Sequence, residues 1–237
     1  GNGLEAIYRF EFGLLSDKAQ LPKQSRLSYV GLAGQLGTVR LGHQWSPLYE
    51  AAFAEIDILN SLDPVFYQGD FRVSNMLFYA APVHAGNVAL ISVIIDGESE
   101  SEKDIDASSL GLKGRWKAFT GAFGYNRNES GDYYASETTL GYDFGGNSQL
   151  WLNYEDSDRP NGVGRVYRAL GALGLGRHIL RALYTDADQT GDSAIQLGWQ
   201  YNFSDNSRVA VEWQALSREA GPDSELLNFA LRTDFYP

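Results

Sequence analysis

The feature that most constrains this chain is an alternation of apolar and polar side chains with a period of two residues. In residues 195–203 every second side chain is Ile, Leu, Trp, Tyr or Phe, and those between them are Gln, Gly or Asn. Residues 207–217 and 225–235 continue the pattern. Because successive side chains of a strand point to opposite faces, this alternation predicts strands with one apolar and one polar face.

The whole chain gives about 14 strand candidates of about ten residues each. Two of them, 87–96 and 164–174, alternate poorly. A short turn such as 145–147 follows one strand, and a longer polar loop such as 126–133 or 156–164 follows the next. The candidates are 4–12, 25–34, 38–45, 71–81, 87–96, 107–115, 117–126, 134–144, 148–156, 164–174, 177–186, 192–202, 207–217 and 225–235.

Composition narrows the class of protein. The formal net charge of −11 argues against nucleic acid as a partner, since phosphate binding needs a basic face. The absence of Cys excludes disulfides, zinc–thiolate sites and Cys nucleophiles. No stretch has the composition of a linker, so we expect one domain over residues 1–237. No signal peptide is visible at Gly1, so we expect either a protein that is not exported or a mature or trimmed chain.

Three architectures produce this alternation: a soluble antiparallel sandwich, a soluble ligand-binding barrel and a transmembrane barrel. The chain contains no run of about 18 apolar residues, which is the length that a membrane-spanning helix needs. The polar faces carry many Gln, Asn, Arg, Asp and Glu side chains, too many for a dry core. Aromatic residues gather near strand ends, as in Tyr8-Arg-Phe10 and Tyr142-Asp-Phe144. Both features favour an all-β, antiparallel transmembrane β-barrel, closed so that no sheet edge faces lipid.

Three segments resemble the general diffusion porins of Gram-negative bacteria. Residues 29–44, YVGLAGQLGTVRLGHQ, are similar to the family's pattern YVGL-G-x-x-GT-x-x-x-G-R-Q. Residues 72–79, RVSNMLFY, followed by Ala81-Pro82 and Gly86, resemble RVxNSxxY-xSP-xxxG. Residues 1–12, GNGLEAIYRFEF, resemble the opening GGGLKAIFQ-E strand. The resemblance covers residues 1–96, and the rest of the chain matches only in its alternating strands and late aromatic residues.

The resemblance implies a passive channel for ions and small hydrophilic solutes in the bacterial outer membrane, surrounded by lipid, assembled as a homotrimer, without enzymatic activity or cofactor. The family's barrel normally has about 16 strands. The two strands that precede its opening motif have no counterpart here, so either two N-terminal strands are absent from this chain or the barrel closes with fewer. The family usually ends on Phe, whereas this chain ends Asp234-Phe-Tyr-Pro237.

A long connection at residues 46–70 separates two of these strands. Loops of this length without secondary structure are uncommon in compact domains and are usually functional. This one has no Lys or Arg, and it holds apolar residues such as Leu48, Phe53 and Ile56 that an exposed loop would lack. In the resembling family the corresponding loop folds into the barrel, narrows the pore and opposes basic side chains. We therefore expect residues 46–70 to form an inward-folded constriction loop.

The candidate site is a charged constriction that would select solutes by a transverse field. Because the loop is acidic and His43 is mostly neutral near pH 7, we expect a modest preference for cations. The alternative for each residue is ordinary: solvated loop carboxylates, arginines paired with a neighbouring Glu, or turn chemistry at Asp70. The acidic candidates are Glu50, Glu55, Asp57, Asp63 and Asp70, and the candidates for the facing side are Arg9, Arg26, Arg40, His43 and Arg72.

Other chemistry has little support in the sequence. An outer-membrane β-barrel protease or lipase needs a catalytic cluster, and neither His84 nor His178 has an evident nucleophile partner. The three histidines lack metal-ligand spacing, so we expect no metal site. The acidic pairs Asp104/Asp106 and Asp186/Asp188 leave a loop-bound calcium ion as an open alternative.

Overall fold

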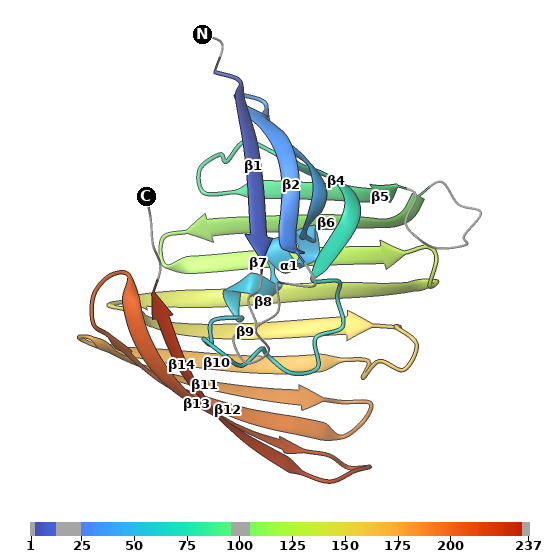
Figure 1. The fold of residues 1–237 in the computed structure, drawn as a ribbon. Coiled ribbons are helices and arrows are strands. Elements are labelled where there is room, and N and C mark those ends of the chain that lie inside the picture. The colour runs from blue at the N-terminus through green and yellow to red at the C-terminus, as the bar shows by residue number, and fades with distance from the viewer. Residues whose placement is uncertain (1–2, 13–24, 96–104, 234–237) are drawn as a thin grey trace. The chain divides into compact units, whose positions relative to one another are not determined.

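A computed structural model describes residues 3–12, 25–95 and 105–233 of the chain. Its 14 strands follow one another in a single antiparallel sheet, in chain order from β1 to β14 (Figure 1). The strands are β1 Glu5–Phe12, β2 Ser25–Gly34, β3 Gly37–Trp45, β4 Arg72–Ala80, β5 Val88–Ile95, β6 Ile105–Trp116, β7 Phe119–Asn128, β8 Tyr133–Gly145, β9 Ser148–Ser157, β10 Val166–Leu175, β11 His178–Ala187, β12 Asp192–Asn202, β13 Ser207–Ser217 and β14 Ser224–Thr233.

The all-β antiparallel prediction is confirmed. Each of the 14 predicted segments corresponds to one strand, with ends that differ by at most two residues. Residue 96 of the predicted segment 87–96 and the last two residues of the predicted segment 225–235 lie outside the described residues. The two segments that alternate poorly are strands as well, β5 and β10.

The chain divides into two compact units, and β6, β7 and β8 contribute residues to both. Unit 1 holds residues 1–52, 69–114 and 122–136, and therefore all of β1–β5. An apolar cluster of this unit joins Met76 and Phe78 of β4 and Leu90 of β5 to Ala51, which follows β3 in the chain. Unit 2 holds residues 53–68, 115–121 and 137–237, and therefore β9–β14.

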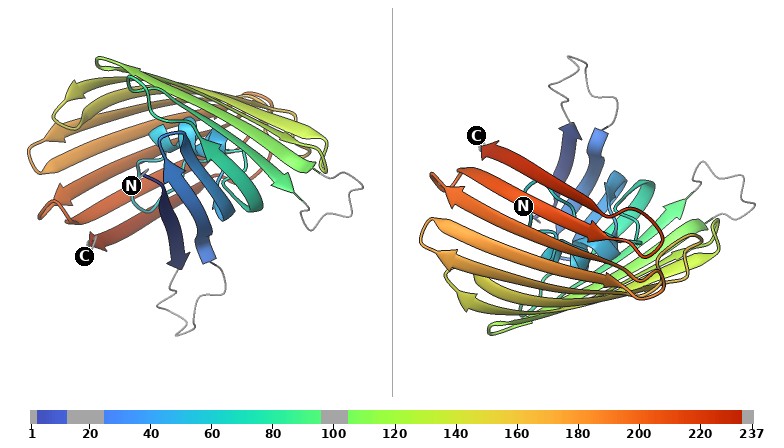
Figure 2. Two further views of the ribbon diagram at one scale, coloured as in Figure 1. Left: turned by 90° about the horizontal axis from the view of Figure 1, so that it is seen from above. Right: turned by 90° about the horizontal axis from the view of Figure 1, so that it is seen from below.

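In unit 2 the strands β9–β14 form a curved sheet, and the segment 53–68 lies on its concave side (Figure 2). Leu197 of β12 and Phe229 and Leu231 of β14 are exposed on the other side. Glu212 of β13 and Gln196 of β12 point to the concave side and are buried. We call the side with the exposed apolar residues the outward face and the opposite side the inward face.

Unit 1 has the same two faces. Leu41 of β3 and Leu77 of β4 are cross-strand partners and both are exposed, so they lie on the outward face. Their neighbours Arg40 and Phe78 form the next pair in the register and lie on the inward face. The inward face thus carries the charged side chain, as the period of two requires.

The connection after β3 is not irregular throughout. It contains the short helix α1 Pro47–Ala51 and the 3₁₀ turn η1 Phe53–Glu55. Ser46 is the N-cap of α1, because its side chain accepts a hydrogen bond from the backbone N–H of Tyr49 at 3.1 Å. Pro47 at the first helical position needs no hydrogen-bond partner for its nitrogen. No helix in the described part of the chain has the length and apolar character needed to cross a membrane.

Candidate functional site

The first part of the connection after β3 lies against the inward face of unit 1. The backbone N–H of Leu48 donates a hydrogen bond to Ser109 Oγ of β6 at 3.3 Å. A Cβ at Gly111 of β6 would lie 2.4 Å from the Pro47 carbonyl oxygen, and one at Gly124 of β7 would lie 2.7 Å from Leu48 Cα. Because glycine has no Cβ, these two positions let α1 approach the sheet this closely.

Arg40 of β3 fixes the acidic residue of α1. Its Nη2 donates to Glu50 Oε2 at 2.7 Å. The guanidinium carbon lies 3.8 Å from the centre of the Phe78 ring and 5.3 Å from that of Tyr29. The side chain is 13% exposed, so both the ion pair and the cation–π contacts are partly shielded from water. Arg40 and Glu50 are thus a predicted basic–acidic pair that the structure brings together.

The second part of the connection, residues 53–68, is held by the inward face of unit 2. Glu212 of β13 accepts hydrogen bonds from the backbone N–H groups of Asn60 at 2.6 Å, Ser61 at 2.7 Å and Leu62 at 3.2 Å. The hydroxyl of Ser61 donates to the same carboxylate at 2.7 Å. Arg208 of β13 donates to the side-chain oxygen of Asn60 at 3.0 Å. A buried carboxylate with several N–H donors is a strong, directional attachment.

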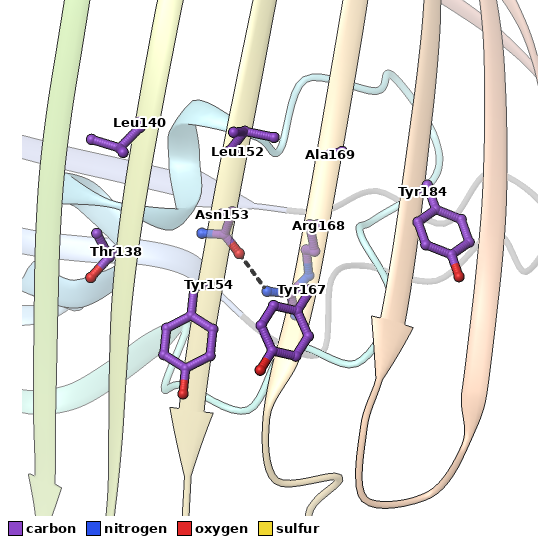
Figure 3. A pocket seen from close by; sticks show the side chains of 9 residues that line it. All are labelled: Thr138, Leu140, Leu152, Asn153, Tyr154, Tyr167, Arg168, Ala169 and Tyr184. Atoms are coloured by element: carbon purple, nitrogen blue, oxygen red, sulfur yellow. Dashed lines mark hydrogen bonds between the residues drawn. The ribbon is translucent and has the colours of Figure 1, made fainter.

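A second attachment is a buried ionic cluster around Arg168 of β10. Its Nη2 donates to Glu155 of β9 at 2.8 Å, and its Nη1 donates to Asn153 at 2.8 Å. Figure 3 shows the Asn153–Arg168 bond. Glu137 of β8 lies 3.9 Å from Nη1, and all three charged side chains are fully buried. The ring of Phe53 lies 5.2 Å from the guanidinium carbon of Arg168.

Gln68, the last residue of the segment 53–68, binds the loop between β9 and β10 through hydrogen bonds. Its backbone N–H donates to Glu155 Oε1 at 2.7 Å. Its side-chain oxygen accepts from the backbone N–H of Val163 at 2.8 Å, and its side-chain nitrogen donates to the Gly164 carbonyl at 2.6 Å. Because both ends of the buried amide group of Gln68 have hydrogen-bond partners, these bonds fix the orientation of its side chain.

Two predicted arginines are already paired. Arg9 of β1 lies 2.7 Å from Glu11, and Arg26 of β2 lies 2.7 Å from the other oxygen of the same carboxylate. Both arginine side chains are about half exposed. The register places Arg9 opposite Tyr29, and Tyr29 opposite Gly42, so Arg9 is on the inward face.

Arg72 and His43 do not lie with Arg40. His43 pairs with Ser28 and shares the outward face of Leu41, two residues earlier in β3. Its Nδ1 is 2.9 Å from Ser74 Oγ. Arg72 pairs with Trp45, and its guanidinium carbon lies 4.8 Å from the Trp45 ring. The β3–β4 register shifts between Gly42 and Gln44, and the pairing of Arg72 with Trp45 lies beyond this shift. A strict alternation with a period of two does not predict such a shift.

The remaining acidic candidates keep contact with solvent. Glu55, Asp57 and Asp70 are partly exposed and Asp63 is exposed. The backbone carbonyl of Asp63 accepts a hydrogen bond from Gln196 of β12 at 3.0 Å, so this residue is held by its main chain and not by its carboxylate. Asp70 Oδ1 accepts from the hydroxyl of Tyr133 of β8 at 3.3 Å.

The residues that hold the segment 53–68 were not predicted from the sequence. The predicted basic residues all lie where the family resemblance lies, in residues 1–96, whereas the attachments come from β8–β10 and β12–β13. Their one visible signal is a charged or amide side chain on the polar face of an alternating strand, as at Gln200 and Glu212. Partners such as Asn60 and Glu212 are separated by 152 residues, and nothing in the sequence pairs them.

The outward face of unit 2 has the side chains of a membrane-exposed surface. Tyr154, Tyr167 and Tyr184 lie together near the ends of β9, β10 and β11, on the face opposite Arg168 (Figure 3). Leu152 and Leu140 lie further along the strands (Figure 3). Tyrosines that border an apolar band are typical of the membrane–water interface of β-barrels.

A single antiparallel sheet with an apolar outward face, aromatic strand ends and a charged inward face that holds a long loop defines a transmembrane channel protein of the β-barrel class. The family model of the Gram-negative porins matches residues 1–232. The chain therefore belongs to the Gram-negative porin family. A comparison with curated proteins found no match.

Solved structures share this fold at low sequence identity. The anion-selective porin from Comamonas acidovorans is 19% identical with a TM-score of 0.79, over 99% of this chain and 86% of that one. OmpF of Salmonella typhi, solved in complex with daunomycin, is 13% identical with a TM-score of 0.76, over 98% and 86%. A loop deletion mutant of OmpT, an outer membrane protein of Vibrio cholerae, is 16% identical with a TM-score of 0.74, over 98% and 86%. At these identities the likeness shows the fold alone.

The family and the fold establish a diffusion channel for ions and solutes in the bacterial outer membrane. They point to a channel and not to an enzyme such as a protease or lipase. Trimeric assembly is typical of the family. No group of three His, Asp or Glu side chains in the described ranges is arranged to hold a metal ion. Asp104, one of the calcium candidates, lies outside those ranges.

Proposed function

We propose that residues 46–70 narrow the channel of this porin and give it a modest preference for cations. The observation that carries the proposal is the charge of the loop together with its placement. It bears Glu50, Glu55, Asp57, Asp63 and Asp70 and no Lys or Arg. Residues 46–52 pack on the inward face of unit 1, and residues 53–68 pack on the inward face of unit 2.

The structural contacts narrow the set of residues that would act on ions. Glu50 is neutralised by Arg40, and Arg9 and Arg26 share Glu11. We place the selectivity on Glu55, Asp57 and Asp63 because their side chains meet solvent within the acidic loop. The anion-selective porin of Comamonas acidovorans is too distant, at 19% identity, to transfer its preference to this chain.

The test is the reversal potential of single channels in a planar bilayer under a salt gradient. The double variant Glu55→Gln, Asp57→Asn is expected to shift the reversal potential toward that of an anion-preferring pore, because two negative charges leave the permeation path. A matched control, Glu219→Gln with Asp223→Asn, removes two exposed acids from the loop after β13. Equal shifts in both variants would contradict the assignment to residues 46–70.

We further propose that the channel is a homotrimer whose contact includes the outward side of β3 and β4. Arg72, His43 and Ser74 form a polar group on a face that otherwise carries apolar residues such as Leu41 and Leu77. A charged side chain facing lipid is costly, and a neighbouring subunit that covers it removes the cost.

The variant Arg72→Gln is expected to lower the temperature at which trimers dissociate on unheated gels, because one interface cation is lost. Arg9→Gln removes the same charge from the inward face of the same unit and serves as the control. A wild-type chain that crosslinks only as a monomer in mild detergent would contradict the trimer.

A further inference from the structure

The outward face of unit 2 contains an apolar groove of about 620 Å³ over β10–β13. Its floor is the cross-strand pair Gly171 and Ala182. Nothing lies within 4 Å of the place that a Cβ would take at Gly171. Larger side chains border this floor, namely Leu173, Leu180, Leu197, Trp199, Val211 and Trp213.

The groove continues along the strands toward the tyrosines of Figure 3. A second hollow of about 360 Å³ is lined by Leu152, Tyr154, Tyr167, Ala169 and Tyr184. Ala169 and Tyr184 are cross-strand partners, two residues from Gly171 and Ala182 along their strands. The two hollows therefore follow one another along the strand direction, as an extended hydrocarbon chain would require.

The other end of the groove is polar and basic. His178 begins β11, and its Nδ1 accepts a hydrogen bond from Trp199 Nε1 at 3.2 Å, which assigns the imidazole proton of the neutral ring to Nε2. Arg177 precedes it in the short turn, is exposed, and donates to the Phe203 carbonyl at 3.4 Å. The turn after β12, which follows Phe203, carries one acid, Asp205.

We propose that this groove is a binding site for one glycerophospholipid. One of its two acyl chains would lie over Gly171 and Ala182, and its phosphodiester would accept hydrogen bonds from Arg177 and His178. A guanidinium is well suited to phosphate oxygens, and the rings of Trp199 and Tyr201 suit the boundary between hydrocarbon and head group. The short turns of such barrels face the periplasm, which puts this head group in the inner leaflet.

The experiment is native mass spectrometry of the full chain in detergent micelles, titrated with palmitoyl-oleoyl phosphatidylglycerol. We expect the first bound lipid molecule to have a higher affinity than the lipid molecules that bind after it. Gly171→Leu fills the floor of the groove and Arg177→Gln removes the cation, so each is expected to weaken this binding by about tenfold. Diacylglycerol with the same acyl chains, which lacks the phosphate, is expected to bind as weakly to the wild type as phosphatidylglycerol binds to Arg177→Gln.

The control is Arg218→Gln, which removes an exposed arginine beyond the opposite end of the sheet, after β13. It is expected to keep wild-type lipid affinity. Unchanged single-channel conductance shows that each variant is folded. The proposal is overturned if diacylglycerol binds as tightly as phosphatidylglycerol, if Gly171→Leu leaves the affinity unchanged, or if Gly171→Leu dissociates the oligomer, since a second subunit would then occupy the groove.

Discussion

At the scale of single residues, two inward carboxylates determine where the segment 53–68 lies. Glu212 accepts three consecutive backbone N–H groups, and Glu155 accepts that of Gln68. Neither is a candidate for contact with ions, because Glu212 is 1% exposed and Glu155 is fully buried. Their charge is used within the protein, on groups that would otherwise be left without partners when the loop packs on the sheet.

The variant Glu212→Gln tests this role. An amide has one acceptor oxygen in place of two and turns N–H donors toward the donors of Asn60 and Ser61, so we expect the attachment to weaken by about 2 kcal/mol. Hydrogen exchange at residues 60–62 should then be faster by roughly thirtyfold. Glu225→Gln, an exposed change on β14, should leave exchange there unchanged. Equal exchange in the two variants would show that Glu212 is not what holds the loop.

At the scale of elements, the strands could be predicted because apolar and polar side chains alternate along most of them. The two poor cases have a physical reason. In β5, Leu90 is buried on the inward face in one cluster with Ala51 of α1. In β10, Val166 and Leu170 are buried on either side of Arg168, which contacts Phe53. Where the loop covers the inward face, that face turns apolar and the alternation fades.

The candidate site was predictable only in part. The acidic loop and Arg40 could be found from the sequence, because an apolar loop without Lys or Arg is unusual and Arg40 lies in a family motif. The separation of Arg72 from Arg40 could not be found, because the pairing of Arg72 with Trp45 depends on one register shift between β3 and β4. The helix α1 was not predicted, and its N-cap Ser46 and first-turn Pro47 lie in the connection that we expected to be a loop.

The contact between α1 and β6 gives a prediction at this scale. In Gly111→Ala the new methyl group would meet the Pro47 carbonyl oxygen at 2.4 Å and Ala51 Cβ at 2.8 Å, so α1 must move away from the strand. We expect a loss of about 1–3 kcal/mol in stability and an altered single-channel conductance. Gly121→Ala on β7 is the control, because its nearest neighbour would be Leu140 Cδ2 at 3.7 Å. Identical conductance in Gly111→Ala and the wild type would show that α1 does not border the permeation path.

At the scale of the whole molecule, the formal net charge of −11 must be distinguished from the charge of the loop. Both would attract cations, but they act over different distances. The Debye length is about 30 Å at 0.01 M salt and about 3 Å at 1 M. A preference produced by charges spread over the protein should therefore vanish at high salt, whereas carboxylates within a few ångströms of a passing ion remain effective for longer.

This difference gives the last prediction. Reversal potentials measured at one fixed salt ratio, from dilute to molar solutions, should show a cation preference that falls with concentration and keeps a small remainder near 1 M. In the variant Glu55→Gln, Asp57→Asn the remainder should disappear, while the part seen in dilute salt should persist, because most of the acids of the chain are unchanged. The control Glu219→Gln, Asp223→Asn should do the opposite and reduce only the dilute-salt part. If the remainder near 1 M survives the loss of Glu55 and Asp57, the narrowest point of the channel lies at other residues.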